Sequence, residues 1–199
     1  MNKELIIVLD FGGQYNQLIA RRVREAGVYC EVHPYKIAID ELKAKNPKGI
    51  ILTGGPNSVY GEDGLFPDEA LWNLDIPILG ICYGAQLMTH ALGGKVSPAL
   101  GKEYGKTEIL IDAKEGLFKD FDDETIMWMS HSDYIEGLPE GFAVTAHTTA
   151  CPVAAMENPA KKMYGVQFHP EVMHSVKGKE LLANFVYGPC GCRGDWKMD

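Results

Sequence analysis

Long apolar runs are missing from this sequence of 199 residues. No stretch approaches the roughly 18 apolar residues that a membrane-spanning helix needs. The first four residues lead directly into a strand pattern and do not resemble a signal peptide. We therefore expect no membrane partner and a cytoplasmic location. The length and the hydrophobic fraction of 46% are typical of one soluble α/β domain with a substantial core.

Basic residues are also scarce. The chain has 19 Lys and Arg against 27 Asp and Glu, which gives a net charge of −8. Its only basic cluster, Arg21, Arg22 and Arg24, lies in a predicted helix. Because contacts to phosphates need clustered positive charge, this balance argues against nucleic acid as a partner.

Signatures of metal and nucleotide sites are missing too. The five cysteines, at positions 30, 82, 151, 190 and 192, are odd in number and do not form two zinc-binding pairs. Neither a disulfide scaffold nor a metal site is therefore expected, although Cys190-Gly191-Cys192 is a weak metal candidate. Gly12-Gly13 follows a strand pattern but matches neither G-x-G-x-x-G nor G-K-[ST], so we expect no nucleotide there.

Strand and helix patterns alternate over the first 95 residues. Strands are predicted over 4–9, 29–32, 49–53 and 78–82, and helices over 14–26, 38–45, 68–73 and from just beyond Cys82 to 92. This alternation predicts right-handed βαβ units and a mostly parallel, open sheet flanked by helices. Shorter strand patterns over 105–112, 125–129, 142–147, 153–157 and 163–168 predict antiparallel strands at the sheet edge, before a last helix over 177–187.

The segment 78–88 is typical of a buried strand that stops at Cys82 and turns directly into a helix. Gly80 and Gly84 flank the cysteine at i−2 and i+2, as glycines flank the serine of a G-x-S-x-G nucleophile elbow, because a strained turn leaves no room for Cβ atoms. The N-terminus of the following helix would favour the thiolate. Cys82 is therefore predicted to be a nucleophile. The alternative is a buried structural cysteine.

A cysteine nucleophile needs a base that takes its proton and a group that orients that base. His169 follows an apolar strand pattern, and Glu171 would lie on the same side of an extended segment, where it could fix the imidazole tautomer. The residues therefore predict a triad of Cys82, His169 and Glu171. Two alternatives stay open, namely His174 as the base and Asp10 as the orienting carboxylate. His169 could also be an ordinary surface histidine at a strand end.

Backbone donors for an oxyanion are expected close to the nucleophile. The N–H of Tyr83 is one, and the loop Gly54-Gly55-Pro56, at the end of a neighbouring parallel strand, offers another. Such a loop by itself is also typical of a simple turn. Since ligands bind at the carboxyl ends of parallel strands, both donors are expected where a substrate would lie.

A polar segment, residues 128–133, is expected to end a strand in the second half of the chain. Its Asp133 could meet a substrate ammonium group. The segment could equally be a capped turn, and the residues alone leave both interpretations open.

Three segments resemble the signatures of class I glutamine amidotransferases. They are Gly54-Gly55-Pro56-Asn57-Ser58-Val59, Gly80-Ile81-Cys82-Tyr83-Gly84-Ala85-Gln86 and Gly165-Val166-Gln167-Phe168-His169-Pro170-Glu171. The resemblance spans essentially the whole chain and implies that family's flavodoxin-like fold, with residues 1–188 as the amidotransferase domain. Gly13 and Ala85 stand where serine and methionine are common in the family, and neither departure removes a catalytic group.

The resemblance implies that Cys82 attacks the side-chain amide of glutamine and releases ammonia. A glutamyl thioester would form, which water would hydrolyse to glutamate. His169 would move the protons and Glu171 would orient it. Gly55 and Tyr83 would line the oxyanion site. The residues that would hold glutamine are Gln86, Gly55, Ser130 and Asp133.

Segments 10–15, 128–133 and 190–196 resemble those family members whose amidotransferase domain leads into an ATP-pyrophosphatase domain. By this resemblance, residues 189–199 begin a linker to a synthetase domain that is not in this chain. That domain would bind XMP and ATP, use ATP and Mg, and receive the ammonia to convert XMP to GMP. The amidotransferase domain itself would need no cofactor or metal. A homodimer of the longer enzyme is left open.

Two other interpretations are compatible with the same fold. One is a γ-glutamyl hydrolase or another cysteine hydrolase, and the other is a non-catalytic regulatory module. The presence of Cys82, His169 and Glu171 together argues against the module. Ammonia release from free glutamine, without cleavage of glutamyl peptides, would distinguish an amidotransferase from a hydrolase.

Overall fold

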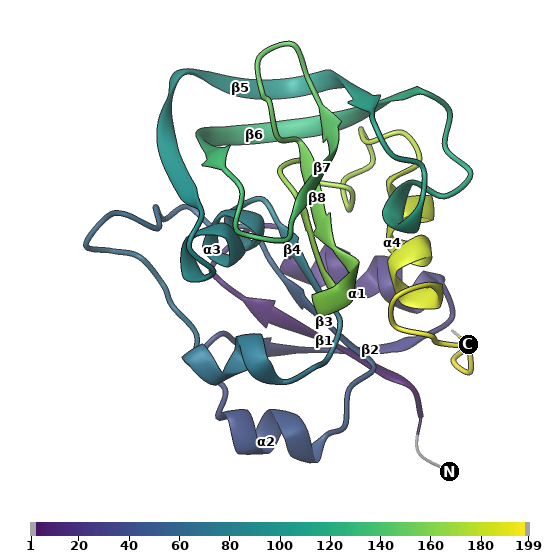
Figure 1. The fold of residues 1–199 in the computed structure, drawn as a ribbon. Coiled ribbons are helices and arrows are strands. Elements are labelled where there is room, and N and C mark those ends of the chain that lie inside the picture. The colour runs from purple at the N-terminus through teal and green to yellow at the C-terminus, as the bar shows by residue number, and fades with distance from the viewer. Residues whose placement is uncertain (1–2, 198–199) are drawn as a thin grey trace.

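The computed structural model describes residues 3–197, with the backbone alone at 100–103. Four parallel strands begin the sheet (Figure 1): β1 (Leu5–Asp10), β2 (Tyr29–Pro34), β3 (Gly49–Leu52) and β4 (Ile78–Ile81). The helices of this half are α1 (Asn16–Glu25), α2 (Ile39–Ala44), the 3-10 helix η1 (Glu69–Asn73) and α3 (Tyr83–Ala91). The predicted βαβ alternation is confirmed.

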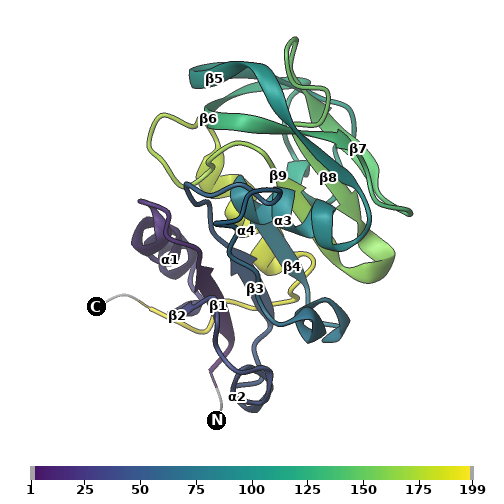
Figure 2. The ribbon, with the colours of Figure 1, turned by 90° about the vertical axis from the view of Figure 1, so that its left-hand side faces the viewer.

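The second half of the chain extends the same sheet. β9 (Met163–Val166) pairs in parallel with β4, and the strands beyond it are antiparallel: β8 (Ala155–Asn158), β7 (Ala143–His147), β5 (Lys95–Ile111) and β6 (Glu124–Gly137). Their order is β2-β1-β3-β4-β9-β8-β7-β5-β6. Figure 2 shows the parallel strands in the lower part of the molecule and the antiparallel strands above them. The predicted mostly parallel sheet with antiparallel edge strands is therefore confirmed.

Helices cover both faces of the parallel part. Because successive residues of a strand point to opposite faces, Ile6 packs in one core with residues of α1 and of α4 (Gly178–Tyr187), whereas Ile7 packs in another with residues of α2 and α3. Two further 3-10 helices, η2 (Gly116–Phe118) and η3 (Pro159–Lys161), lie in connections. In the part of the chain that the structure describes, no helix is long and apolar enough to cross a membrane.

β5 and β6 are longer than the sequence predicts. The predicted strand over 105–112 begins at Lys95, and the strand expected to end in the polar segment 128–133 continues to Gly137. The two strands pair with each other along almost their whole length. Buried positions alternate along β6, but three of them hold polar residues, Thr125, His131 and Asp133, so the apolar alternation is interrupted in the sequence.

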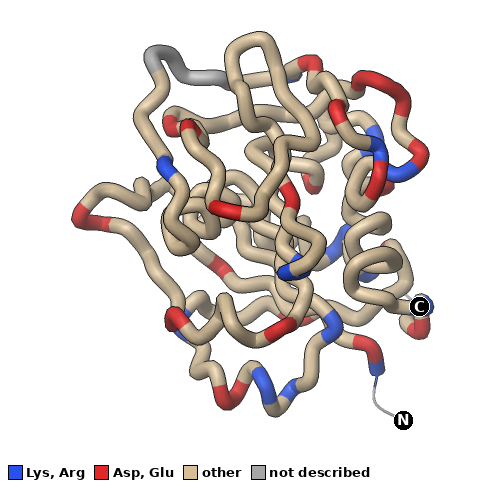
Figure 3. Tube along the Cα trace, in the orientation of Figure 1, with Lys and Arg blue, Asp and Glu red and all other residues tan. Residues whose placement is uncertain are grey.

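Arg22 and Arg24 of α1 form hydrogen bonds with the backbone of neighbouring segments. Arg22 donates a hydrogen bond from Nε to the backbone carbonyl of Glu171 at 3.1 Å, and Arg24 donates from Nη2 to the carbonyl of Cys30 at 2.6 Å. Other Lys and Arg positions are scattered among Asp and Glu along the chain (Figure 3). These two arginines of the basic cluster therefore tie α1 to β2 and to the segment after β9.

The tail, residues 189–197, folds back onto the amino ends of β1 and β2. The carboxylate of Glu4 accepts from the backbone N–H of Arg193 at 2.9 Å, and the N–H of Trp196 donates to Gly27 at 2.9 Å. The Trp196 ring lies 4.9 Å from that of Tyr29, and the ammonium of Lys3 lies 4.5 Å from the Trp196 ring. The tail is thus packed on the domain, and its assignment as the start of a linker stays a prediction.

Replacement of Trp196 tests how strongly the tail is held. We expect Trp196→Ala to lower the free energy of unfolding by about 1–2 kcal/mol, because an aromatic pair and a cation–π contact are lost. Amide hydrogen exchange over 190–197 should rise, as mass spectrometry would show. Tyr104→Ala, at a side chain that is 60% exposed, should change the stability by less than about 0.5 kcal/mol. Unchanged exchange in the Trp196 variant would contradict this account.

Candidate active site

Cys82 occupies a sharp turn between β4 and α3. Its φ of 54° and ψ of −106° lie where residues other than glycine are rarely found, and such strain is concentrated at functional sites. Its N–H donates to Val166 of β9 at 2.8 Å, and its carbonyl accepts from Ala85 and Gln86 in the first turn of α3. The predicted strand-turn-helix geometry is therefore present at Cys82.

The two glycines of the elbow, Gly80 and Gly84, are required by close backbone contacts. A Cβ at Gly80 would lie 2.6 Å from the carbonyl carbon and oxygen of Gly84. A Cβ at Gly84 would lie 2.5 Å from the carbonyl oxygen of Leu52 in β3. Since real Cβ atoms do not approach backbone atoms so closely, only glycine lets α3 begin this near to β3 and β4.

His169 and Glu171 lie together after β9. Imidazole Nδ1 is 2.7 Å from Oε1 of Glu171, whose side chain is fully buried. Pro170 and Glu171 form a turn and not the extended segment that the sequence suggested, so the carboxylate reaches the ring by chain reversal. The alternatives lie elsewhere: Asp10 accepts from the N–H of Gly12, and the His174 ring packs 5.1 Å from that of Trp128.

The backbone of His169 is fixed by β6. Its N–H donates to the carbonyl of Trp128 at 2.9 Å. The hydroxyl of Ser175 accepts from the N–H of Trp128 at 2.8 Å and donates to the carbonyl of His169 at 2.6 Å. The long strand β6 therefore holds the loop that carries the histidine.

The surroundings of His169 favour its protonated form. Burial by itself lowers the pKa of His169, but hydrogen bonds to Cys82 and Glu171, and the negative charges of both groups, outweigh burial and raise it to about 11. At neutral pH the ring is therefore an imidazolium between a sulfur and a carboxylate. An imidazolium beside a cysteine sulfur is an arrangement that activates thiol nucleophiles.

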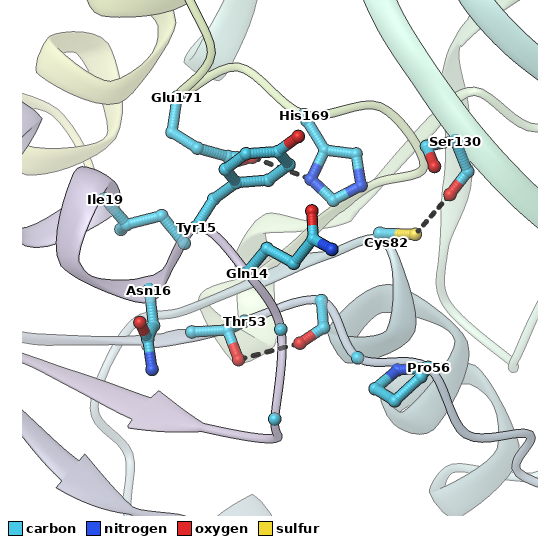
Figure 4. A pocket seen from close by; sticks show the side chains of 14 residues that line it. Gln14, Tyr15, Asn16, Ile19, Thr53, Pro56, Cys82, Ser130, His169 and Glu171 are labelled. Atoms are coloured by element: carbon cyan, nitrogen blue, oxygen red, sulfur yellow. Dashed lines mark hydrogen bonds and ion pairs between the residues drawn. The ribbon is translucent and has the colours of Figure 1, made fainter.

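A pocket of about 320 Å³ opens beside these residues at the carboxyl ends of the parallel strands. Figure 4 shows Gln14 pointing toward Cys82 and His169, and the Tyr15 ring beside His169 and Glu171. Gln14 and Tyr15 come from the loop between β1 and α1. The lining residues are Gly12, Gly13, Gln14, Tyr15, Asn16, Ile19, Thr53, Gly54, Gly55, Pro56, Cys82, Ser130, His169 and Glu171. The polar groups of the triad thus meet at one cavity.

Sequence reasoning missed the contribution of the loop 12–16 to this pocket. In the sequence, the glycines of this loop indicated only that no nucleotide binds there. The loop follows β1, however, and β1 lies next to β3 in the sheet. A loop at the carboxyl end of β1 could therefore have been expected at the pocket. The Tyr15 ring lies 5.8 Å from that of His169, edge to face. A Cβ at Gly13 would lie 2.4 Å from the carbonyl oxygen of Gly54. Glycine at position 13 therefore lets the two loops pack against each other.

The two expected oxyanion donors belong to segments that border Cys82. Gly55 lines the pocket, and a Cβ there would lie 2.5 Å from the carbonyl oxygen of Phe11. Tyr83 is the first residue of α3, so its N–H has no carbonyl four residues earlier within the helix. Its side chain points elsewhere and bonds the backbone of Leu65. Both N–H groups therefore belong to segments at the carboxyl end of the sheet.

The expected glutamine-holding residues divide into two groups. Ser130 lines the pocket, and its carbonyl accepts from Cys82 Sγ at 3.6 Å. Asp133 does not line the pocket, and its carboxylate accepts from the hydroxyls of Ser58 and Tyr60. Gln86 is buried and bonds inside the protein. Because Asp133 lies within β6, the capped-turn alternative is wrong.

Comparison with known proteins gives a consistent result. Residues 7–188 match the family described as glutamine amidotransferase class-I. The chain is 61% identical over 199 residues to a GMP synthase [glutamine-hydrolyzing] of Clostridium botulinum and 61% identical over 198 residues to one of Acetivibrio thermocellus. Each match covers 100% of this chain but only 39% of the relative. The chain therefore spans about two fifths of the length of these curated relatives.

Solved structures with the same fold include a protein from Thermoplasma acidophilum that is described as a putative GMP synthase subunit. Its TM-score is 0.84 at 32% sequence identity, with 96% of both chains covered. A glutamine amidotransferase from Thermotoga maritima has a TM-score of 0.77 at 17% identity, with 96% of this chain and 100% of that one covered. The second likeness concerns the fold alone.

Alanine at Gly84 tests the packing of the elbow. We expect Gly84→Ala to lower the free energy of unfolding by about 1–3 kcal/mol, because the new Cβ would press on the carbonyl of Leu52. Chemical denaturation measures this effect. Gly137→Ala is the matched control, since a Cβ there would meet its nearest atom at 3.6 Å, and it should be neutral within about 0.5 kcal/mol. Equal stabilities of the two variants would refute the packing argument.

Replacing Glu171 by glutamine tests the electrostatics of His169. Because the carboxylate raises the pKa of His169, Glu171→Gln should lower it from about 11 by about one unit or more. The imidazolium is then lost at a lower pH, as NMR titration of the ring would show. Asp112→Asn removes the carboxylate 2.8 Å from His147 and should leave His169 unchanged. A titration of His169 that is the same in both variants would rule out the assigned cause.

Proposed function

The chain belongs to the class I glutamine amidotransferase family, and from this membership we propose that it is the glutaminase part of a GMP synthase. It hydrolyses glutamine to glutamate and ammonia through a cysteinyl thioester. The observation that carries the proposal is the convergence of Cys82, His169 and Glu171 at one pocket. Its support from relatives is the 61% identity to GMP synthases over the whole chain.

The proposed reaction begins with attack by the Cys82 thiolate. Sulfur forms a bond to the side-chain amide carbon of glutamine, and the carbonyl electrons move onto oxygen, which the N–H groups of Gly55 and Tyr83 stabilise. The carbon–nitrogen bond then breaks as the His169 imidazolium gives its proton to nitrogen, and ammonia leaves. Glu171 keeps the ring oriented during this transfer.

The second half of the reaction releases glutamate. Neutral His169 takes a proton from water, and the water oxygen attacks the thioester carbon. Collapse of the tetrahedral intermediate breaks the carbon–sulfur bond and restores the thiolate and the imidazolium. Ser130, at the pocket wall, is proposed to contact glutamine. Asp133 accepts from the hydroxyls of Ser58 and Tyr60 and is proposed to bind the substrate ammonium through its remaining lone pairs.

The ammonia needs an acceptor. This chain covers 39% of the length of a GMP synthase among the curated relatives. The remaining length of that relative supports a partner domain that accepts the ammonia. We propose that this partner is an ATP-pyrophosphatase domain that binds XMP and ATP, uses Mg, and aminates XMP to GMP. Residues 189–199 would begin the connection to it.

Loss of the nucleophile tests the proposal. We expect Cys82→Ala to reduce ammonia release from glutamine by a factor on the order of 10³ or more, and Cys151→Ala to retain it. The assay contains XMP, ATP and the acceptor domain of a relative, with a parallel assay that omits the acceptor domain. A glutamine-like diazo-ketone should label Cys82 only, as peptide mass mapping would show.

Two results would contradict the proposal. Unchanged ammonia release by Cys82→Ala would exclude the thioester route. Cleavage of glutamyl peptides without release of ammonia from free glutamine would instead indicate a γ-glutamyl hydrolase.

A further inference from the structure

A chain of hydrogen bonds runs beneath the pocket and ends on the nucleophile. Gln167 Nε2 donates to Cys82 Sγ at 3.6 Å, and Gln167 Oε1 accepts from Gln86 Nε2 at 3.3 Å. The same Gln86 Nε2 donates to the backbone carbonyl of Asp133 at 3.3 Å. Gln167 is fully buried and Gln86 is 3% exposed. Neither side chain lines the pocket, so this network contacts Cys82 from outside the cavity.

The donor-to-acceptor direction of these hydrogen bonds is fixed at Asp133, the end farthest from Cys82. The carbonyl of Asp133 can only accept a hydrogen bond, so Gln86 must present its NH₂ group there. That NH₂ group also faces Gln167, which must then offer its oxygen to Gln86. The remaining amide end of Gln167, its own NH₂ group, therefore points at sulfur. The network thus imposes a donor, and excludes an acceptor, at the back of Cys82.

A donor at this place has a definite electrostatic consequence. A thiolate accepts a hydrogen bond well, whereas a thiol accepts weakly, and hydrogen bonds to a charged partner are the stronger ones. A buried N–H on Sγ therefore stabilises the charged form that attacks the substrate. The thiol form donates to the carbonyl of Ser130 at 3.6 Å, a bond that the thiolate cannot make, whereas the N–H of Gln167 bonds the thiolate more strongly than the thiol.

We propose that Gln167 is a positioning residue that favours and orients the Cys82 thiolate, with Gln86 fixing the orientation of its amide. Gln86 would contribute to this effect through Gln167, by its hydrogen bond to the Gln167 amide oxygen. This inference rests on the proposed function in that Cys82 is taken to be the nucleophile. Gln167 lies within the segment 165–171 that also contains His169 and Glu171. The sequence alone assigns it no role, because its contact with Cys82 depends on how the strands pack.

The test measures the rate of Cys82 alkylation by iodoacetamide as a function of pH. Gln167→Met keeps the approximate length of the side chain and removes the donor. We expect its alkylation profile to move to higher pH by about one unit, with a rate at neutral pH about tenfold lower. Gln167→Glu places acceptor oxygens at the sulfur and should shift the profile further. Gln17→Glu, the same change on the exposed face of α1, should leave the profile unchanged.

Gln86→Leu tests the orienting role. It should give a smaller shift than Gln167→Met, and it should add little to that variant in the double substitution, because both act through one hydrogen bond. Near-UV circular dichroism and thermal melting establish that each variant is folded. If Gln167→Glu does not fold, Gln167→Met alone decides the outcome.

The two kinds of negative result separate this inference from the proposed function. A folded Gln167→Met variant with the wild-type profile would overturn the role of Gln167 and leave the function intact. Wild-type Cys82 that reacts no faster than free cysteine at the same pH would instead contradict the proposed function.

Discussion

The backbone turn at Cys82 is the constraint on which the other parts of the site depend. The residue has a positive φ because β4 must pass into α3 within one residue, and the turn closes only where Gly80 and Gly84 allow backbones to touch. The turn is also tied sideways, by the bond from Cys82 N–H to Val166. A strained residue persists only where its neighbours over-determine it, and here β3, β4 and β9 all contribute.

The sheet order explains how distant segments reach this turn. β4 lies between β3, which leads to the loop of Gly54 and Gly55, and β9, which leads to His169 and Glu171. Parallel strands end at the same edge, so the proposed oxyanion donor, nucleophile and base meet there without long connections. β6, from the far end of the sheet, returns over the site and bonds the backbone of His169. The parallel half places the chemistry, and the antiparallel half holds it in position.

Much of this arrangement could be predicted from short segments of the sequence. The elbow around Cys82 and the pairing of His169 with Glu171 are local features, determined by glycine spacing and by a two-residue separation. The contacts of Gln14, Tyr15 and Gln167 depend on which strands become neighbours, which local patterns do not specify. The sequence pattern did not predict the full length of β6 for a different reason. The buried face of this strand carries His131 and Asp133, and tertiary hydrogen bonds accommodate these polar side chains.

The packing of the tail onto the domain has a consequence for the delivery of ammonia. Trp196 is held at the amino ends of β1 and β2, whereas the pocket opens at the carboxyl end of the sheet. β1 has six residues, so these two ends lie about 20 Å apart at about 3.3 Å per residue. A domain attached through the tail therefore starts on the far side of the sheet from the ammonia it would receive. Under the proposed function, the connection to that domain would have to lead from the amino ends of the strands towards the opposite edge of the sheet, where the pocket opens.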